Sequence, residues 1–216
     1  MITQTIHCGF CGVESSQLVA EAAQELEPPD FDTRPGREIR ATLPAWMQRC
    51  PNCGYCASDI ATIHDGAVAM LGNEMYHRQL NDSAFPEKAR EFLCHALILQ
   101  QVGQFADAGW TSLHAAWACD DAGDLASSVA CRKHALTLWE RGKQSGQNFG
   151  DDTMLEYVLV TDLYRRSGQF EQAVVAASEA LDSDDVKPPV VEAIFRREKS
   201  LAERRDDQAH SLSELS

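Results

Sequence analysis

Four cysteines near the start of the chain form two closely spaced pairs, and a thiolate is a good ligand for a soft metal ion. The first pair lies in Cys8-Gly-Phe-Cys11-Gly and the second in Cys50-Pro-Asn-Cys53-Gly, so each pair is a CxxCG knuckle. Two thiolates two residues apart can face one ion only if the backbone turns tightly, and the glycine after the second cysteine permits that turn. Two knuckles offer four thiolates, the closed tetrahedral donor set of structural zinc. We therefore predict that Cys8, Cys11, Cys50 and Cys53 hold one metal ion.

The identity of the metal is open between two alternatives. The segment LPAWMQRCPNCG (43–54) resembles the second knuckle of rubredoxin, in which a four-cysteine iron carries single electrons. Rubredoxin has a dense aromatic core, whereas residues 1–60 of this chain contain only four aromatic side chains: Phe10, Phe31, Trp46 and Tyr55. We therefore favour zinc and keep iron as the alternative. Cys56 forms a second, overlapping CxxC with Cys53, and we interpret it as a spare cysteine that packs beside the site; exchange with Cys53 is the alternative.

The sequence contains none of the common catalytic signatures. HExxH, GxSxG, GxxxxGK[ST] and GxGxxG are all absent from it. It has one Glu-x-x-His motif, Glu74 to His77, and a di-iron bundle needs two such motifs. A four-thiolate zinc also has no open position for water or substrate. We therefore predict no enzymatic activity and no catalytic residue.

The chain divides near residue 60 into a part rich in turns and a part rich in helix. Before this point, prolines and cysteines surround one helical pattern at 15–27, which Pro28-Pro29 ends. After it, helix-favouring stretches alternate with short connectors, and Gly103, Gly123 and Gly168 lie at expected helix turns.

Two of these joints share a pattern, because LILQQVGQFADA (97–108) matches DLYRRSGQFEQA (162–173). The pattern resembles the middle of a tetratricopeptide repeat. We predict a mostly α fold: a tetratricopeptide-like antiparallel helical array (61–205) after a small zinc ribbon with rubredoxin-like knuckles (1–60), and a flexible tail (206–216). A plain helical bundle is the alternative to the array.

Charge and hydropathy limit the environment and the partners. The net charge is −14, which opposes binding to nucleic acid and to anionic lipid. No apolar run approaches the roughly 18 residues that a membrane span requires, so we expect no membrane segment. The first residues have neither a basic start nor an apolar stretch, and closely spaced cysteines suit a reducing compartment, so we expect a cytoplasmic protein.

With both knuckles and the helices in view, the chain resembles a group of bacterial proteins, the domain-of-unknown-function family numbered 2225. The matching residues are Cys8-Cys11-Gly12, the stretch Asp32-Thr33-Arg34-Pro35, Trp46, and Cys50-Pro51-x-Cys53-Gly54-Tyr55-x-Ala57. The resemblance implies a zinc-ribbon start and a tetratricopeptide-like helical remainder. It implies no reaction.

We expect an interaction protein whose helical groove binds a protein or peptide. Residues 61–216 carry 25 acidic and 15 basic side chains, so the partner should be basic or amphipathic. Self-association into a homodimer is an alternative, because five basic residues near the C-terminus could enter the acidic groove of a second copy: Arg196, Arg197, Lys199, Arg204 and Arg205. A nucleic-acid-binding ribbon is another alternative, and the residues that suggest it are Arg34, Arg37, Arg40 and Arg49. Eight acids in residues 1–60 weigh against it.

Overall fold

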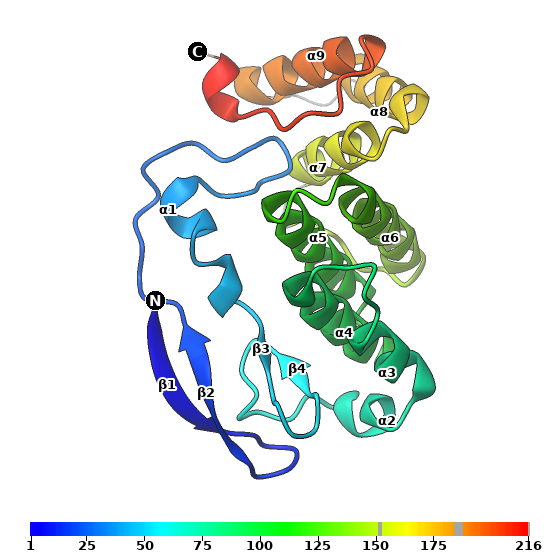
Figure 1. Ribbon diagram of the computed structural model, residues 1–216. Helices are drawn as coiled ribbons and strands as arrows, with labels where there is room; N and C mark the ends of the chain where they lie inside the picture. Colours follow the sequence, from blue (N-terminus) through cyan, green and yellow to red (C-terminus); the bar gives the residue numbers. More distant parts are fainter. Residues whose placement is uncertain (151–152, 184–187, 216) are drawn as a thin grey trace.

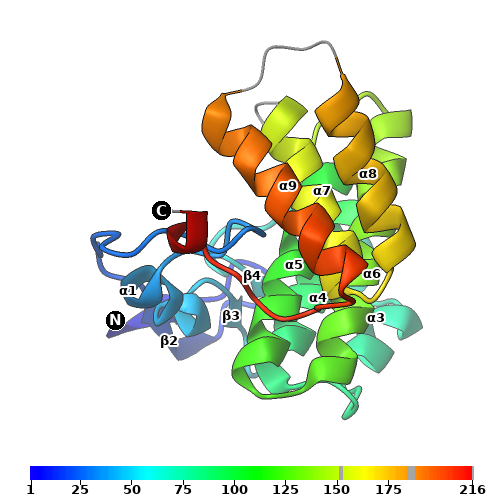
Figure 2. The same ribbon diagram turned by 90° about the horizontal axis from the view of Figure 1, so that it is seen from above.

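The computed structural model describes residues 1–150, 153–183 and 188–215, and these residues form a mostly helical protein, as the sequence predicts. The helices stack into a column, and the N-terminal part with its strands runs along one side of that column (Figure 1). Seen from above, the same two parts lie side by side (Figure 2).

The N-terminal part consists of two β-hairpins joined by a long connector. The strands are β1 (Ile2–His7), β2 (Glu14–Val19), β3 (Gln48–Arg49) and β4 (Cys56–Ala57). β1 pairs with β2 and β3 pairs with β4, and both pairs are antiparallel. The connector contains the short helix α1 (Arg37–Arg40) and a 3-10 turn, η1 (Leu43–Ala45). Each predicted CxxCG knuckle is the loop of one hairpin, which is the arrangement of a zinc ribbon.

The predicted helix at 15–27 is wrong. Residues Glu14–Val19 are strand β2, and none of the residues 20–27 is helical. The chain returns from the first knuckle directly beside β1, so Ser15 pairs with Ile6 and Val19 with Ile2. The β-branched residues of β1 favour this pairing, and the backbone bonds of the hairpin override the weak helix propensity of the Ala-rich stretch.

The helical part follows in one continuous series. Its helices are α2 (Ala67–Leu71), α3 (Glu74–Leu80), α4 (Glu87–Gln101), α5 (Phe105–Asp121), α6 (Leu125–Gln144), α7 (Thr153–Arg166), α8 (Phe170–Asp182) and α9 (Pro189–Glu203). The predicted glycine turns separate α4 from α5, α5 from α6 and α7 from α8. Consecutive long helices pack against each other in pairs. The likeness to tetratricopeptide repeats remains a prediction.

One hydrophobic core crosses the predicted boundary at residue 60. Tyr55 and Ile60 from the first part are fully buried in the same cluster as Tyr76, Phe92 and Leu113 from the helices. Tyr55 also donates a hydrogen bond to the carbonyl of Thr62 (2.9 Å). The two predicted units therefore share their interior.

The predicted tail, 206–216, lies against the N-terminal connector over its described residues. The N–H of Phe31 donates to the carbonyl of His210 (2.9 Å), and that of Leu212 donates to the carbonyl of Pro29 (3.0 Å). The described part of this segment finishes with a 3-10 turn, η2 (Leu212–Leu215). Among the described residues, no helix combines the length and the apolar character that crossing a bilayer requires.

Candidate functional site

The four predicted ligands meet at the end of the molecule where the two hairpin loops face each other. The Sγ atoms of Cys8 and Cys53 are 3.7 Å apart, those of Cys11 and Cys50 are 3.6 Å apart, and all four lie within 4.8 Å of one another. A tetrahedron with metal–sulfur bonds of about 2.3 Å has edges of about 3.8 Å. The thiols therefore stand at the spacing that a tetrahedral metal ion requires, so this cluster could hold one ion.

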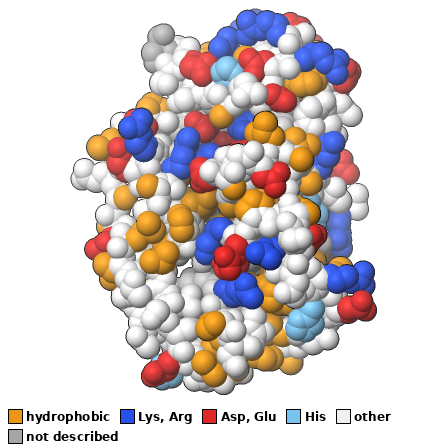
Figure 3. All heavy atoms as spheres, viewed as in Figure 1, with side chains coloured by type: hydrophobic (Ala, Val, Ile, Leu, Met, Phe, Trp, Pro, Cys, Tyr) orange, Lys and Arg blue, Asp and Glu red, His pale blue; other side chains and the backbone are white. Residues whose placement is uncertain are grey.

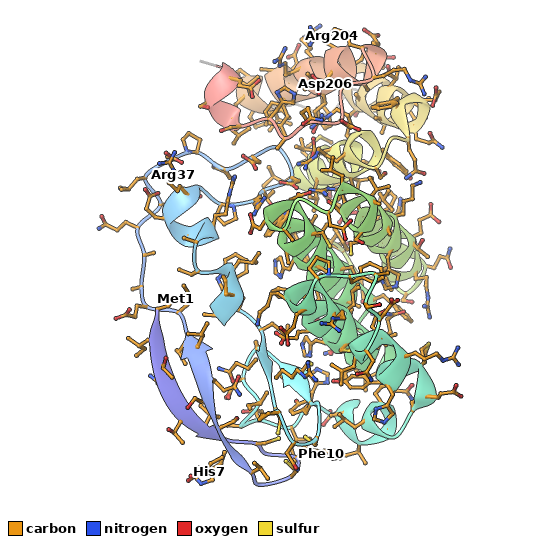
Figure 4. All side chains as sticks on the ribbon, viewed as in Figure 1. Met1, His7, Phe10, Arg37, Arg204 and Asp206 are labelled. Atoms are coloured by element: carbon orange, nitrogen blue, oxygen red, sulfur yellow. The ribbon has the colours of Figure 1, made fainter. Side chains whose placement is uncertain are left out.

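Local backbone structure explains this geometry. The N–H of Gly12 donates to the carbonyl of Cys8 (2.7 Å), and the N–H of Gly54 donates to that of Cys50 (2.9 Å). Both glycines have a positive φ, 72° and 76°, which a residue with a Cβ adopts only with strain. The two knuckles therefore have the same turn, and each turn points two thiols toward the centre. Phe10 marks the tip of the first knuckle in Figure 4.

The thiols differ in their electrostatic surroundings. The backbone N–H of Val13 and the side chain of Asn52 face the Cys11 thiol and lower its pKa to about 6. Burial raises the pKa of the Cys8 thiol and of the Cys53 thiol. A dication would favour the thiolate form of all four residues, because a coordinating thiol loses its proton. The donor set thus fits a soft metal ion, and its geometry is the same for zinc and iron.

Cys56 lies outside the cluster. Its side chain is fully buried, and its Sγ donates to the carbonyl of Gly54 (3.3 Å). Its thiol faces that of Cys94, and burial raises its pKa well above the ordinary value. Its backbone N–H donates to the hydroxyl of Tyr76 (3.1 Å), which itself donates to Gly54 (2.9 Å). This placement agrees with a spare cysteine packed beside the site.

The four N-terminal arginines that suggested nucleic acid face carboxylates. Arg34 is buried and contacts Asp121 (2.5 Å). The pairs Arg40–Asp30, Arg49–Glu87 and Arg37–Glu27 are separated by 2.8, 3.6 and 4.0 Å. Only Arg37 is largely exposed among the four, and it points away from the helical column (Figure 4). Acidic and basic side chains are interspersed over the face drawn in Figure 3, which gives the phosphate backbone no basic stripe there.

A buried ion network joins the connector to the helices. Asp32 is fully buried and accepts hydrogen bonds from Trp117 Nε1 (2.8 Å) and Arg132 (3.3 Å), while Arg166 lies 3.8 Å away. Asp120 also accepts from both arginines, at 2.7 and 3.2 Å. Burial opposes ionisation of Asp32, but the two arginines outweigh it and lower its pKa. Sequence reasoning missed this network, because its members lie up to 134 positions apart and no local motif links them.

A groove of about 710 Å³ opens between α6, α7 and α8. Its aromatic wall consists of Trp139, Tyr157 and Tyr164, and Val175 contributes an apolar side chain that is 54% exposed. The charged side chains of its lining are Lys143, Glu171 and Glu179. Lys143 sits over the ring of Trp139, 4.6 Å from its centroid. The aromatic wall and the two glutamates together can therefore accept a ligand that carries an apolar side chain next to a positively charged one.

The comparisons with known proteins give one match. Residues 46–202 match the model of the family described as DUF2225, uncharacterised protein conserved in bacteria. The matched segment contains the second knuckle and the helices through most of α9. No curated protein and no solved structure matches the chain.

Proposed function

Since the chain belongs to the bacterial family DUF2225, which offers no reaction to transfer, we propose from its own geometry that it is a non-catalytic, zinc-binding interaction protein of the cytoplasm. The groove between α6, α7 and α8 binds a protein or peptide segment. The single observation that supports this reading is the groove itself, an apolar and aromatic hollow bordered by two carboxylates and one lysine.

The chemistry of the groove favours an amphipathic or basic segment. Apolar side chains of the ligand would pack on Tyr157, Tyr164 and Val175, and a lysine or arginine would face Glu171 and Glu179. The N–H of Trp139 donates to Glu156 (2.8 Å), so this indole is held in place before a ligand arrives. A preordered aromatic wall lowers the entropy that binding costs.

The metal supports the fold in this proposal. Four thiolates would close the coordination sphere of zinc and join the two hairpin loops, the second of which has strands of only two residues. We prefer zinc over iron because the N-terminal part has few aromatic side chains around the cluster.

A peptide display experiment tests the proposed groove. Zinc-loaded protein is exposed to a library of random peptides, and we expect the enriched sequences to combine apolar residues with lysine or arginine. Val175→Arg should weaken their binding at least tenfold, because it places a positive charge on the apolar floor. Val68→Arg is the matched control, since Val68 is 68% exposed on α2, outside the groove. Acid-rich peptides, or equal binding by both variants, would show that the groove is not the site.

Self-association remains the alternative source of a basic ligand. Within the chain, Arg205 already contacts Glu171 at the edge of the groove (3.3 Å), and Arg197 contacts Glu214 (2.9 Å). If the groove binds a second copy, Arg205→Glu should lower the dimer fraction in sedimentation equilibrium. Deletion of 190–216 would be a poor test, because it removes Phe195 and Leu201 from the core.

A further inference from the structure

A second hollow lies between the segment after the second knuckle and the helices α4 and α5. It consists of two recesses of about 600 and about 420 Å³. Both are lined by Ser58, His64, His95 and Gln104, so the two recesses adjoin at these residues, and together they are called the cleft. The cleft shares no lining residue with the groove between α6, α7 and α8, nor with the four-cysteine cluster.

Aromatic rings form one wall of this cleft. Trp46, Phe92, Trp110 and His114 line it, and the ring centroid of His114 lies 5.2 Å from that of Trp46 and 5.7 Å from that of Phe92. The indole N–H of Trp46 donates to Thr42 (2.7 Å), and that of Trp110 donates to the carbonyl of Phe149 (2.5 Å). Because these N–H groups are used inside the protein, the two indoles offer the cleft their rings. Such a wall suits a planar ligand.

Two histidines at the junction of the recesses present one acceptor and one donor. His95 Nδ1 lies 3.1 Å from the carbonyl of Cys56, and a carbonyl only accepts, so the proton is on Nδ1 and Nε2 keeps a lone pair. His64 Nδ1 accepts from the N–H of Gly66 (3.5 Å), so its neutral ring carries the proton on Nε2. The rings stand at 88° with centroids 5.8 Å apart. Burial lowers the pKa of His95 to about 4, which keeps it neutral at pH 7.

Both Nε2 atoms are available to a ligand. Within residues 1–150, 153–183 and 188–215, neither nitrogen has a protein hydrogen-bond partner. Both histidines are only partly exposed, so a ligand that reaches them leaves bulk water. A donor and an acceptor that the ligand itself covers discriminate strongly against ligands that cannot pair with them.

The charge of the lining excludes phosphate. The acidic side chains around the cleft are Asp59, Asp65 and Asp107, and no lysine or arginine lines either recess among the described residues. Asp59 already accepts from the N–H of Ala61 (2.9 Å) and from Thr62 (3.2 Å). A phosphate-bearing ligand would therefore meet negative charge without a compensating cation.

We propose that this cleft binds an uncharged planar heteroaromatic ring with adjacent hydrogen-bond donor and acceptor groups, namely a nucleobase as the free base or nucleoside. The ring packs on the wall of Trp46 and Trp110. Its N–H or amino group donates to His95 Nε2, and its carbonyl or ring nitrogen accepts from His64 Nε2. The proposal is independent of the groove between α6, α7 and α8.

The test uses the zinc-loaded full chain and four nucleosides: adenosine, guanosine, cytidine and uridine. Each is titrated beside its own 5′-monophosphate, and binding is followed by calorimetry and by the indole N–H signals of Trp46 and Trp110. We expect at least one nucleoside to bind with a Kd below about 1 mM and its monophosphate to bind at least tenfold more weakly. No binding by any of the four, or equal binding of the phosphate forms, overturns the proposal.

Variants then locate the site. His95→Ala and His64→Ala should each weaken the binding nucleoside at least tenfold, whereas His77→Ala, an exposed histidine of α3, should bind like the wild type. Wild-type affinity in both cleft variants overturns the proposal. If a variant fails to fold, nitrogen-15 spectra of the wild-type imidazoles give the same answer. We expect the nucleoside to shift Nε2 of His95, and an unmoved Nε2 signal at saturation refutes the assignment.

Discussion

Replacing Asp32 with alanine should destabilise the whole protein much more than the loss of an ordinary ion pair does. The change removes the fully buried carboxylate that faces Trp117, Arg132 and Arg166. Arg132 and Arg166 are 1% and 8% exposed, so after the substitution only Asp120 and its neighbours balance two buried cations. Removing one partner of a buried ion pair typically costs about 3–5 kcal/mol, because it leaves an uncompensated charge.

The expected loss is measurable by thermal and urea denaturation at pH 7. For a chain of this size, 1 kcal/mol corresponds to about 2–4 °C in Tm, so Asp32→Ala should lower Tm by about 6–20 °C. The pKa of Asp32 is lowered in the fold, so its contribution is complete above the ordinary aspartate pKa and disappears only as the pH falls through the lowered value. Measurement at pH 7 therefore captures all of it.

An exposed ion pair provides the control. Glu74 and Arg78 on α3 are 3.2 Å apart, with side chains 82% and 75% exposed. Glu74→Ala should change the free energy of unfolding by less than about 0.5 kcal/mol. Asp32→Asn keeps the shape of the side chain and an acceptor for Trp117 but loses the charge. Its loss in the free energy of unfolding should therefore lie between the losses of Glu74→Ala and Asp32→Ala. If Asp32→Ala costs less than about 1 kcal/mol, the arginines do not depend on this carboxylate and the reasoning is refuted.

Three further predictions concern the metal and the partly buried imidazoles of His95 and His114. Purified protein should contain about one zinc per chain, with Zn–S distances of about 2.3 Å by X-ray absorption, and a red, iron-absorbing protein would instead support the rubredoxin-like alternative. Cys56→Ser should retain the metal, whereas Cys50→Ser and Cys53→Ser should lose it; retained zinc in Cys53→Ser would show that Cys56 can replace a ligand. Burial lowers the pKa of both His95 and His114 to about 4, so between about pH 6.5 and 4 the unfolded chain binds more protons and stability falls as the pH falls. At pH 5.5 each imidazole should lower the free energy of unfolding by about 1.4 kcal/mol. Between pH 7 and pH 5.5, His114→Phe should therefore lose less stability than the wild type by about one such contribution, as measured by urea denaturation at both pH values. An unchanged pH dependence in that variant would contradict this.

The sequence predicts the cysteine cluster well because the cause is local. A CxxCG turn is determined by five consecutive residues, so both knuckles can be identified without knowing the fold. The helix turns at Gly103, Gly123 and Gly168 are local in the same way. The error at 15–27 has a different origin: β2 pairs with β1 across the CxxCG turn between them, and helix propensity carries no information about that pairing.

Other features depend on contacts between distant positions. Arg34 is one of the four arginines that suggested a nucleic-acid-binding ribbon, yet it is buried beside Asp121, 87 positions away. The wall of the cleft combines Trp46 with Trp110, and the two histidines proposed to bind the ligand, His64 and His95, come from a loop and from α4. No pattern in the linear chain brings these residues together, so only the packing of the N-terminal part against the helices shows them.

The second knuckle connects the metal cluster to the cleft. The chain passes from Cys53 through Gly54 directly to Tyr55, whose hydroxyl accepts from the backbone N–H of His64 (2.9 Å). The next residue, Cys56, supplies the carbonyl that determines the tautomer of His95. Both histidines are therefore positioned by residues within three places of a predicted ligand. A metal ion held by the four cysteines would stabilise the turn that precedes these residues, so we expect the geometry of the cleft to depend on an intact four-cysteine cluster. The shared core around Tyr55 would extend that dependence to the helices.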